Sequence, residues 1–407
     1  MRIDGKKMSM VFLTFLMVIF LLVPAAASTQ VNLVFNGYDY QADVYVENGV
    51  SYISGASLQK IPGLQVEQDG YIPLRSFFES REAKVDWDNS KKEINVSWCE
   101  MNGDWSADEL MIESTKLLKE INSYKLRGNT SIEMAIMGQD TTETQNIPKI
   151  NTLMEGVFQQ EPMAMYCKQT AKLPLEDMEI TEEEAQLFDQ GEMTTEMVWK
   201  DNAIYQKMSP FSDQWIMMDL AEMDLMDNLT NMLQTSPQQS LEMMREFGVI
   251  YLFGEDVEIN GQDYYTVKNY VDSLTFKKIF EEYMGALNLN SLITEPGTGE
   301  EESAENTMSI EQIMEELLAT MELDYYIDSF INKDTLRTEK MRFNMELKYQ
   351  LDETVNPEGP IAFDMKIAGE FDYYDFGTEV ELPDVSDAIT QEELIEQMNT
   401  MEVPEEE

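Results

Sequence analysis

The chain has 407 residues, with 78 acidic and 28 basic side chains, no histidine and a formal net charge of −50. Such a charge repels phosphate backbones and anionic lipid headgroups, which argues against nucleic-acid binding and against electrostatic docking to a membrane surface. The length allows two or three domains, and the acidity is typical of a highly soluble extracellular surface.

The N-terminus has the features of a secretory signal peptide. Basic residues precede an apolar run over residues 8–23, and Ala25 and Ala27 form an A-x-A cleavage signal. We therefore expect residues 1–27 to be removed, since the apolar run is short for a membrane span; an uncleaved anchor is the alternative. No second long apolar stretch follows, so the mature chain is expected to have no integral membrane span.

The next stretch, residues 28–100, predicts a small domain of short strands and helices. Residues 71–98 read Y-I-P-L-R-S-F-F-E-S-R-E-A-K-V-D-W-D-N-S-K-K-E-I-N-V-S-W. With the strand patterns before them, they resemble the copper amine oxidase N-terminal-like domain of exported Gram-positive proteins, although Glu82 stands where that family usually has glycine. The resemblance implies a non-catalytic attachment module, because copper oxidase chemistry needs imidazole ligands and the chain has no histidine.

Two cysteines, Cys99 and Cys167, follow from this point on. In an exported protein a disulfide between them is allowed, and two buried free thiols are the alternative. A zinc site is not expected from two cysteines without histidine.

The second domain is predicted to begin with a helix, followed by strands and then by a block of helices. Ser106-Ala107-Asp108-Glu109 is a capping box that opens a helix. Alternation of apolar and polar residues then predicts strands over residues 124–137 and 150–170, the second bending at Glu161-Pro162, and a meander from residue 193. Helices are predicted over residues 220–233, after the Ser236 cap, over 273–285 and over 309–320. Residues 294–307 have the composition of a disordered loop.

The clearest strand covers residues 341–351, where apolar and polar side chains alternate without a fault. At about 3.4 Å per residue it spans roughly 35 Å, so it needs long neighbours and a broad cover for its apolar side. Residues 363–373 alternate in the same way and predict its partner.

These elements predict an α+β fold: an antiparallel, one-sided sheet over residues 104–389 with helices in its concavity, followed by a short helix and acidic tail in 390–407. The order of elements, and the segment V-W-K-D-N-A-I-Y-Q-K before Trp215, resemble the LolA/LppX-like superfamily of half-barrel carriers of lipoproteins and lipids, in its exported Gram-positive branch. The resemblance implies a hydrophobic cavity between sheet and helices that holds a lipid or lipopeptide.

The candidate cavity residues are apolar side chains on the strands, and methionine, with 31 copies, is common among them. Flexible thioethers suit a pocket that adapts to an acyl chain, and they suit an ordinary core equally well. The candidates are Ile132, Met134, Met154, Trp199, Trp215, Met341, Phe343, Met345, Leu347, Met365 and Ile367.

No catalytic, cofactor-binding or metal-ligating set is predicted. Without histidine, a serine or cysteine nucleophile lacks its ordinary base, and paired carboxylates carry no information in so acidic a chain. The sequence therefore favours a non-enzymatic carrier or sensor of a hydrophobic ligand at the outer face of the cell envelope. The alternative is a structural or interaction protein of the envelope with an envelope partner and no ligand.

Overall fold

The computed structural model describes residues 31–64, 66, 70–137, 144–173, 175, 191–209, 212–219, 236–287, 318–351, 361–390 and 393–394. The expected signal peptide with Ala25 and Ala27, the predicted helix 220–233 and the predicted loop 294–307 lie outside the described residues. The chain divides into two compact units, Met1–Gln59 with Gln65–Trp98, and Lys60–Leu64 with Cys99–Glu407.

The first unit contains two small sheets. One has the strand order β2-β1-β7-β6, and the other has the order β3-β4-β5. Their bounds are β1 Asn32–Phe35, β2 Tyr38–Tyr40, β3 Val44–Glu47, β4 Val50–Ser54, β5 Tyr71–Pro73, β6 Lys84–Asp88 and β7 Glu93–Ser97. Strand β4 leads into α2 (Gly55–Gln59) and its neighbour β5 leads into α3 (Leu74–Glu79), so two strand-helix copies lie side by side with Ile53 paired to Ile72. Leu58, Leu74 and Phe78, which these helices contribute, are fully buried.

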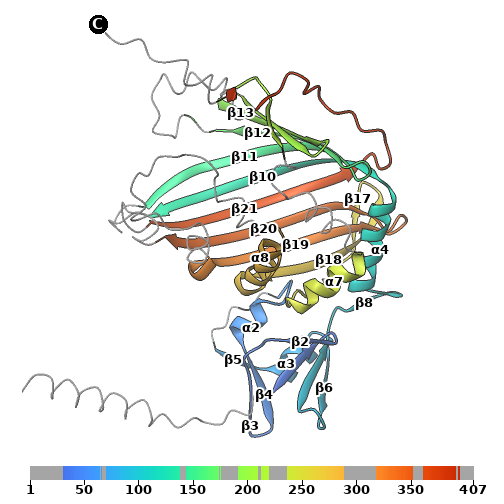
Figure 1. Ribbon diagram of the computed structural model, residues 1–407. Helices are drawn as coiled ribbons and strands as arrows, with labels where there is room; N and C mark the ends of the chain where they lie inside the picture. Colours follow the sequence, from blue (N-terminus) through green and yellow to red (C-terminus); the bar gives the residue numbers. More distant parts are fainter. Residues whose placement is uncertain are drawn as a thin grey trace, which may run out of the picture. The chain divides into compact units, whose positions relative to one another are not determined.

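The second unit is built on one sheet of thirteen strands among the described residues (Figure 1). Its order from edge to edge is β16-β18-β19-β20-β21-β10-β11-β12-β13-β14-β15-β22, with β17 paired to β18. The bounds are β10 Ser123–Met137, β11 Thr144–Gln159, β12 Ala164–Lys172, β13 Glu192–Lys200, β14 Ala203–Ser209, β15 Ile216–Asp219, β16 Tyr251–Phe253, β17 Val257–Ile259, β18 Gln262–Asp272, β19 Glu322–Asn332, β20 Thr338–Leu351, β21 Ile361–Tyr374 and β22 Ile389–Thr390. A two-stranded hairpin, β8 (Met101–Asn102) and β9 (Trp105–Ser106), precedes it.

The sheet is open, because its path starts at β16 and ends at β22 without closing on itself. All pairs are antiparallel except β15 with β22. The predicted antiparallel half-barrel is therefore consistent with the structure, but the α+β label needs correction: strands dominate the described residues and helices are few. The long one-sided strands pair mainly with one another, so the fold is mainly β.

Two predicted strands have different bounds in the structure. The strand predicted over residues 341–351 starts earlier, at Thr338. The stretch 150–170 is a hairpin and not one bent strand, since β11 and β12 pair antiparallel around the turn at Glu161-Pro162. β21 then lies beside β10, more than two hundred residues away in the chain (Figure 1).

Three helices of this unit are described: α4 (Ala107–Glu120), α7 (Pro237–Glu246) and α8 (Ser273–Leu287). Helix α4 begins at the predicted capping box, in which Ser106 Oγ accepts the Glu109 N–H and the Glu109 carboxylate accepts the Ser106 N–H. Ala107 and Leu110 pack on Phe253, Val267 and Ile331, so α4 covers one end of β16, β18 and β19. Asp108 of α4 forms an ion pair with Arg245 of α7, which joins the two helices.

Candidate functional site

Most of the predicted cavity residues lie along one apolar face of the large sheet. Side chains alternate along a strand, and residues paired across an antiparallel ladder share a face. The register of β20, β21 and β10 places apolar or small residues opposite one another in four successive rows. These rows are Met341–Phe371–Gly128, Phe343–Gly369–Thr130, Met345–Ile367–Ile132 and Leu347–Met365–Met134.

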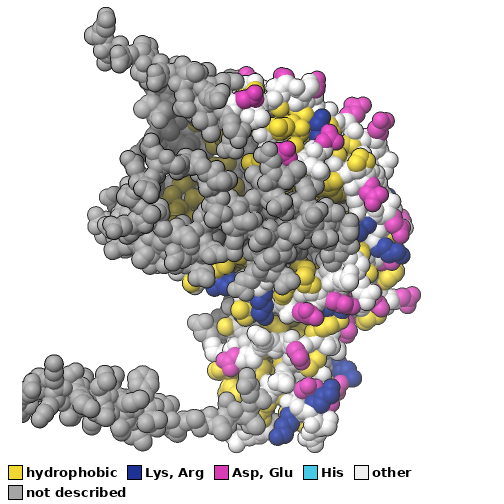
Figure 2. Space-filling model, viewed as in Figure 1, with side chains coloured by type: hydrophobic (Ala, Val, Ile, Leu, Met, Phe, Trp, Pro, Cys, Tyr) yellow, Lys and Arg dark blue, Asp and Glu magenta, His cyan; other side chains and the backbone are white. Residues whose placement is uncertain are grey.

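The large apolar side chains on this face are half-buried over the four central strands. No side chain larger than threonine that β20, β21, β10 and β11 place there is fully buried in the described residues. The fully buried residues of this unit lie elsewhere, for example Val267 and Ile331 under α4, and Val198 on the opposite face. The space-filling view shows hydrophobic side chains reaching the surface of this unit between acidic ones (Figure 2).

Two glycines let aromatic rings lie flat on the middle of this face. A Cβ built on Gly369 would lie 2.6 Å from Cε1 of Phe343, and one on Gly128 would lie 2.1 Å from Cδ1 of Phe371. Each ring therefore occupies the space above a glycine of the neighbouring strand. The two rings are stacked, with centroids 6.0 Å apart and planes 10° apart. The rings of Phe343 and Phe371 therefore lie flat against the sheet, and we call this pair the aromatic floor.

An aromatic cluster ends the face beside the N-terminus of β10. The ring of Tyr124 lies 5.2 Å from that of Phe158 and 5.7 Å from that of Tyr373. Burial raises the pKa of Tyr373 to about 12 and also raises the pKa of Tyr124, so both hydroxyls stay neutral at ordinary pH.

The structure gathers most of the predicted cavity residues on this one face. They are Ile132, Met134, Met154, Trp199, Met341, Phe343, Met345, Leu347, Met365 and Ile367. Trp215 lies elsewhere: it is buried with Val198 and Val385 on the opposite face, under the C-terminal segment that leads to β22. Gly128, Gly369 and Phe371 were missed, although a glycine at an inward position of a strand is itself a sign of close packing.

Cys99 and Cys167 are both free, half-buried thiols in the structure, where the sequence allowed either a disulfide between them or two buried free thiols. Burial raises the pKa of each thiol, which favours the protonated form. Cys167 belongs to the apolar face, where it pairs with Gly156.

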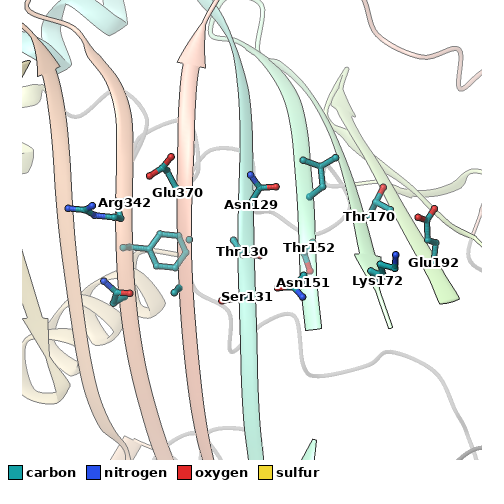
Figure 3. A pocket seen from close by; sticks show the side chains of 15 residues that line it. Asn129, Thr130, Ser131, Asn151, Thr152, Thr170, Lys172, Glu192, Arg342 and Glu370 are labelled. Carbon is teal, nitrogen blue, oxygen red and sulfur yellow. The ribbon is translucent and has the colours of Figure 1, made fainter. Parts of the chain in front are cut away.

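A cavity of about 620 Å³ lies over the central strands, and most of the residues that line it are polar or charged (Figure 3). Of the predicted cavity residues, Phe343 is the one that contributes to it. Most of the other lining residues, for example Asn129, Asn151 and Arg342, belong to the face opposite the apolar one, whereas Thr130, Thr152 and Gly369 share a row with Phe343. The structure therefore presents two distinct surfaces on one sheet.

Among the described residues, no helix is both long enough and apolar enough to cross a membrane.

Comparisons with known proteins give one family and several solved structures. A model described as "Family of unknown function (DUF6612)" matches residues 106–391. Lipoprotein LppX of Mycobacterium tuberculosis is 10% identical over 68% of this chain and 98% of its own, with a TM-score of 0.29. LprF of Mycobacterium bovis is 10% identical over 69% and 96%, with a TM-score of 0.30. A DUF1329 family protein from Desulfovibrio piger is 10% identical over 68% and 94%, with a TM-score of 0.18.

These superpositions are too loose to assign a function. No curated protein matches the sequence. The resemblance of residues 31–98 to the copper amine oxidase N-terminal-like domain receives no support from the comparisons and stays a prediction.

Proposed function

Through residues 106–391 this chain belongs to the family of unknown function DUF6612, and we propose that it is a non-enzymatic protein that binds a hydrophobic ligand on the apolar face of its large sheet. The ligand class is a lipid or lipopeptide with at least one acyl chain. We further propose that the protein is exported and acts at the outer face of the cell envelope, with the first unit serving attachment.

The observation that carries this proposal is the half-buried state of a broad apolar face. A face that only closed over its own core would bury its large side chains, as Val267 and Ile331 are buried under α4. Each methylene of an acyl chain that leaves water contributes about 0.8 kcal/mol. Met341, Met345 and Met365 line the rows beside the aromatic floor, and thioether side chains adapt their shape to a flexible chain.

The test is a titration with a fluorescent fatty acid, cis-parinaric acid, on the full chain. Met345→Lys places a charge in the middle of the apolar face. It is expected to weaken binding about tenfold or more, since a buried apolar side chain contributes about 1.5–3 kcal/mol. Asn344→Lys is the matched control, because Asn344 precedes Met345 in β20 and points to the other face. This control is expected to bind as the unchanged protein does.

Native mass spectrometry of protein purified from its host gives the independent readout. A co-purifying lipid is expected. A clean apo mass, together with no rise in melting temperature with any lipid, contradicts the proposal and leaves an envelope scaffold whose apolar face contacts only its own side chains.

A further inference from the structure

The polar cavity on the opposite face of the sheet is a groove between two rows of side chains that cross the strands (Figure 3). The hydrogen-bond register defines both rows, because each residue is paired to the next across a ladder. One row is Asn344, Ala368, Ser131, Asn151, Lys172 and Glu192, and the other is Arg342, Glu370, Asn129, Leu153 and Thr170. Every residue of both rows lines the cavity.

The groove offers uncharged hydrogen-bonding groups. Within the part of the chain that the structure describes, the side chains of Asn129, Asn151, Asn344 and Ser131 form no hydrogen bond. Each amide provides two donors and an acceptor, and a hydroxyl provides one donor and two acceptor positions. These groups are therefore open to a ligand with many hydroxyls.

Of the four charged residues that line the groove, Arg342 and Glu370 each have a partner within the protein, and Lys172 and Glu192 are opposite charges at paired positions of the β12–β13 ladder. Arg342 donates to Asp328 at 2.6 Å, and Glu370 pairs with Lys340. A ligand in the groove thus meets balanced charges and needs no net charge of its own. A polyanionic ligand is disfavoured by the formal net charge of −50.

An aromatic pair continues the first row beyond Asn344. Tyr326 is the register partner of Asn344, and Tyr270 is the partner of Tyr326. Their rings lie 4.6 Å apart, and Tyr326 is 37% exposed. Neither ring belongs to the lining of the cavity, so the pair ends the row on the β20 side without forming a wall of the groove.

The length of the groove and its position in the middle of the sheet indicate which class of ligand it can bind. Six strands, β20 to β13, contribute to the groove, and at about 4.8 Å between strands they span roughly 24 Å. An extended peptide would bind by adding to a sheet edge, but the backbone groups of these central strands are already paired on both sides. We infer that this groove binds a linear, uncharged oligosaccharide, and it does so independently of the lipid proposed for the apolar face.

The experiment is isothermal titration of the full chain with cellohexaose and with chitohexaose. Ala368→Arg places a long side chain in the centre of the groove and is expected to weaken binding at least tenfold. Ala362→Arg is the matched control, since Ala362 lies on the same face of the same strand, six residues away and outside the groove. It is expected to leave the affinity unchanged.

A second variant separates loss of binding from loss of folding. Asn344→Ala with Asn151→Ala removes two amides from exposed positions, and it is expected to weaken binding while the melting temperature and parinaric acid affinity stay as they were. The inference is overturned by a lack of binding of both hexasaccharides to the unchanged chain. Equal affinities of the two arginine variants, or binding of an extended polar peptide instead, overturn it as well.

Discussion

At the scale of single residues, the middle of the apolar face depends on two positions without a side chain. Gly369 lies beneath the ring of Phe343, and Gly128 lies beneath the ring of Phe371. Glycine in a strand interior is ordinarily a cost in chain entropy. Here it allows two rings to stack flat across three strands, which a Cβ at either position would prevent.

We predict that Gly369→Ala destabilises the protein by about 1–3 kcal/mol, because the added methyl overpacks the site. The built Cβ meets Phe343 Cζ at 2.7 Å and Thr130 Cγ2 at 2.9 Å. Urea unfolding measures the change, and a double-mutant cycle with Phe343→Ala assigns it. The cost of Gly369→Ala should be smaller when the ring is absent. Equal costs in both backgrounds would show that the ring is not the obstacle.

At the scale of elements, two helices begin with a capping box, but the side chain at the third helical position is a carboxylate in one and an amide in the other. In α4 the capping box is Ser106 with Glu109, and in α7 it is Ser236 with Gln239. Hydrogen bonds from the Ser106 backbone and side chain hold the pKa of Glu109 below its usual value. Gln239 makes the equivalent bond without a titratable group.

We predict that the stability contributed by the α4 box depends on pH, whereas that of the α7 box does not. A carboxylate with a lowered folded-state pKa stabilises the fold above its unfolded pKa, and this stabilisation is lost as pH falls through the lowered value. Ser106→Ala and Ser236→Ala should each cost about 1 kcal/mol at pH 7. On acidification below about pH 4.5, the cost of Ser106→Ala should shrink and that of Ser236→Ala should persist. Thermal unfolding in parallel pH series compares the two variants, and identical pH profiles would contradict this account.

At the scale of the whole molecule, charge is the dominant property. A formal net charge of −50 destabilises the compact state through self-repulsion. The polar face of the large sheet offsets this locally, where Lys340 pairs with Glu370 and Asp372, and Lys366 pairs with Glu346. Such exposed pairs contribute little each, so the repulsion summed over the chain outweighs them.

We therefore predict that the melting temperature rises with sodium chloride between about 0.01 M and 0.3 M, because the screening length falls from about 30 Å to less than 8 Å over this range. Differential scanning calorimetry measures the shift, and choline chloride should act alike if screening is the cause. A melting temperature that falls with salt would mean that the ion pairs of the polar face outweigh the net repulsion.

Strand β20 shows how much of the fold could be predicted from the sequence alone. Its alternation predicted the strand and its apolar face, since the side-chain period of two is a local property of the chain. The capping box of α4 and the Ser236 cap of α7 were also readable, because a cap joins residues only three positions apart. The same local signals predicted which apolar residues of β10, β20 and β21 face one way.

What only the tertiary structure decided is the register between distant strands. Pairing β21 with β10 sets Gly128 against Phe371 and Ser131 against Ala368, and so creates both the aromatic floor and the polar groove. The packing of the C-terminal segment with Val385 likewise places Trp215 on the opposite face from Trp199. A shift of one residue would exchange the two faces of a strand. The sequence by itself therefore determined which residues of β10, β20 and β21 share a face, and long-range pairing determined which of them meet.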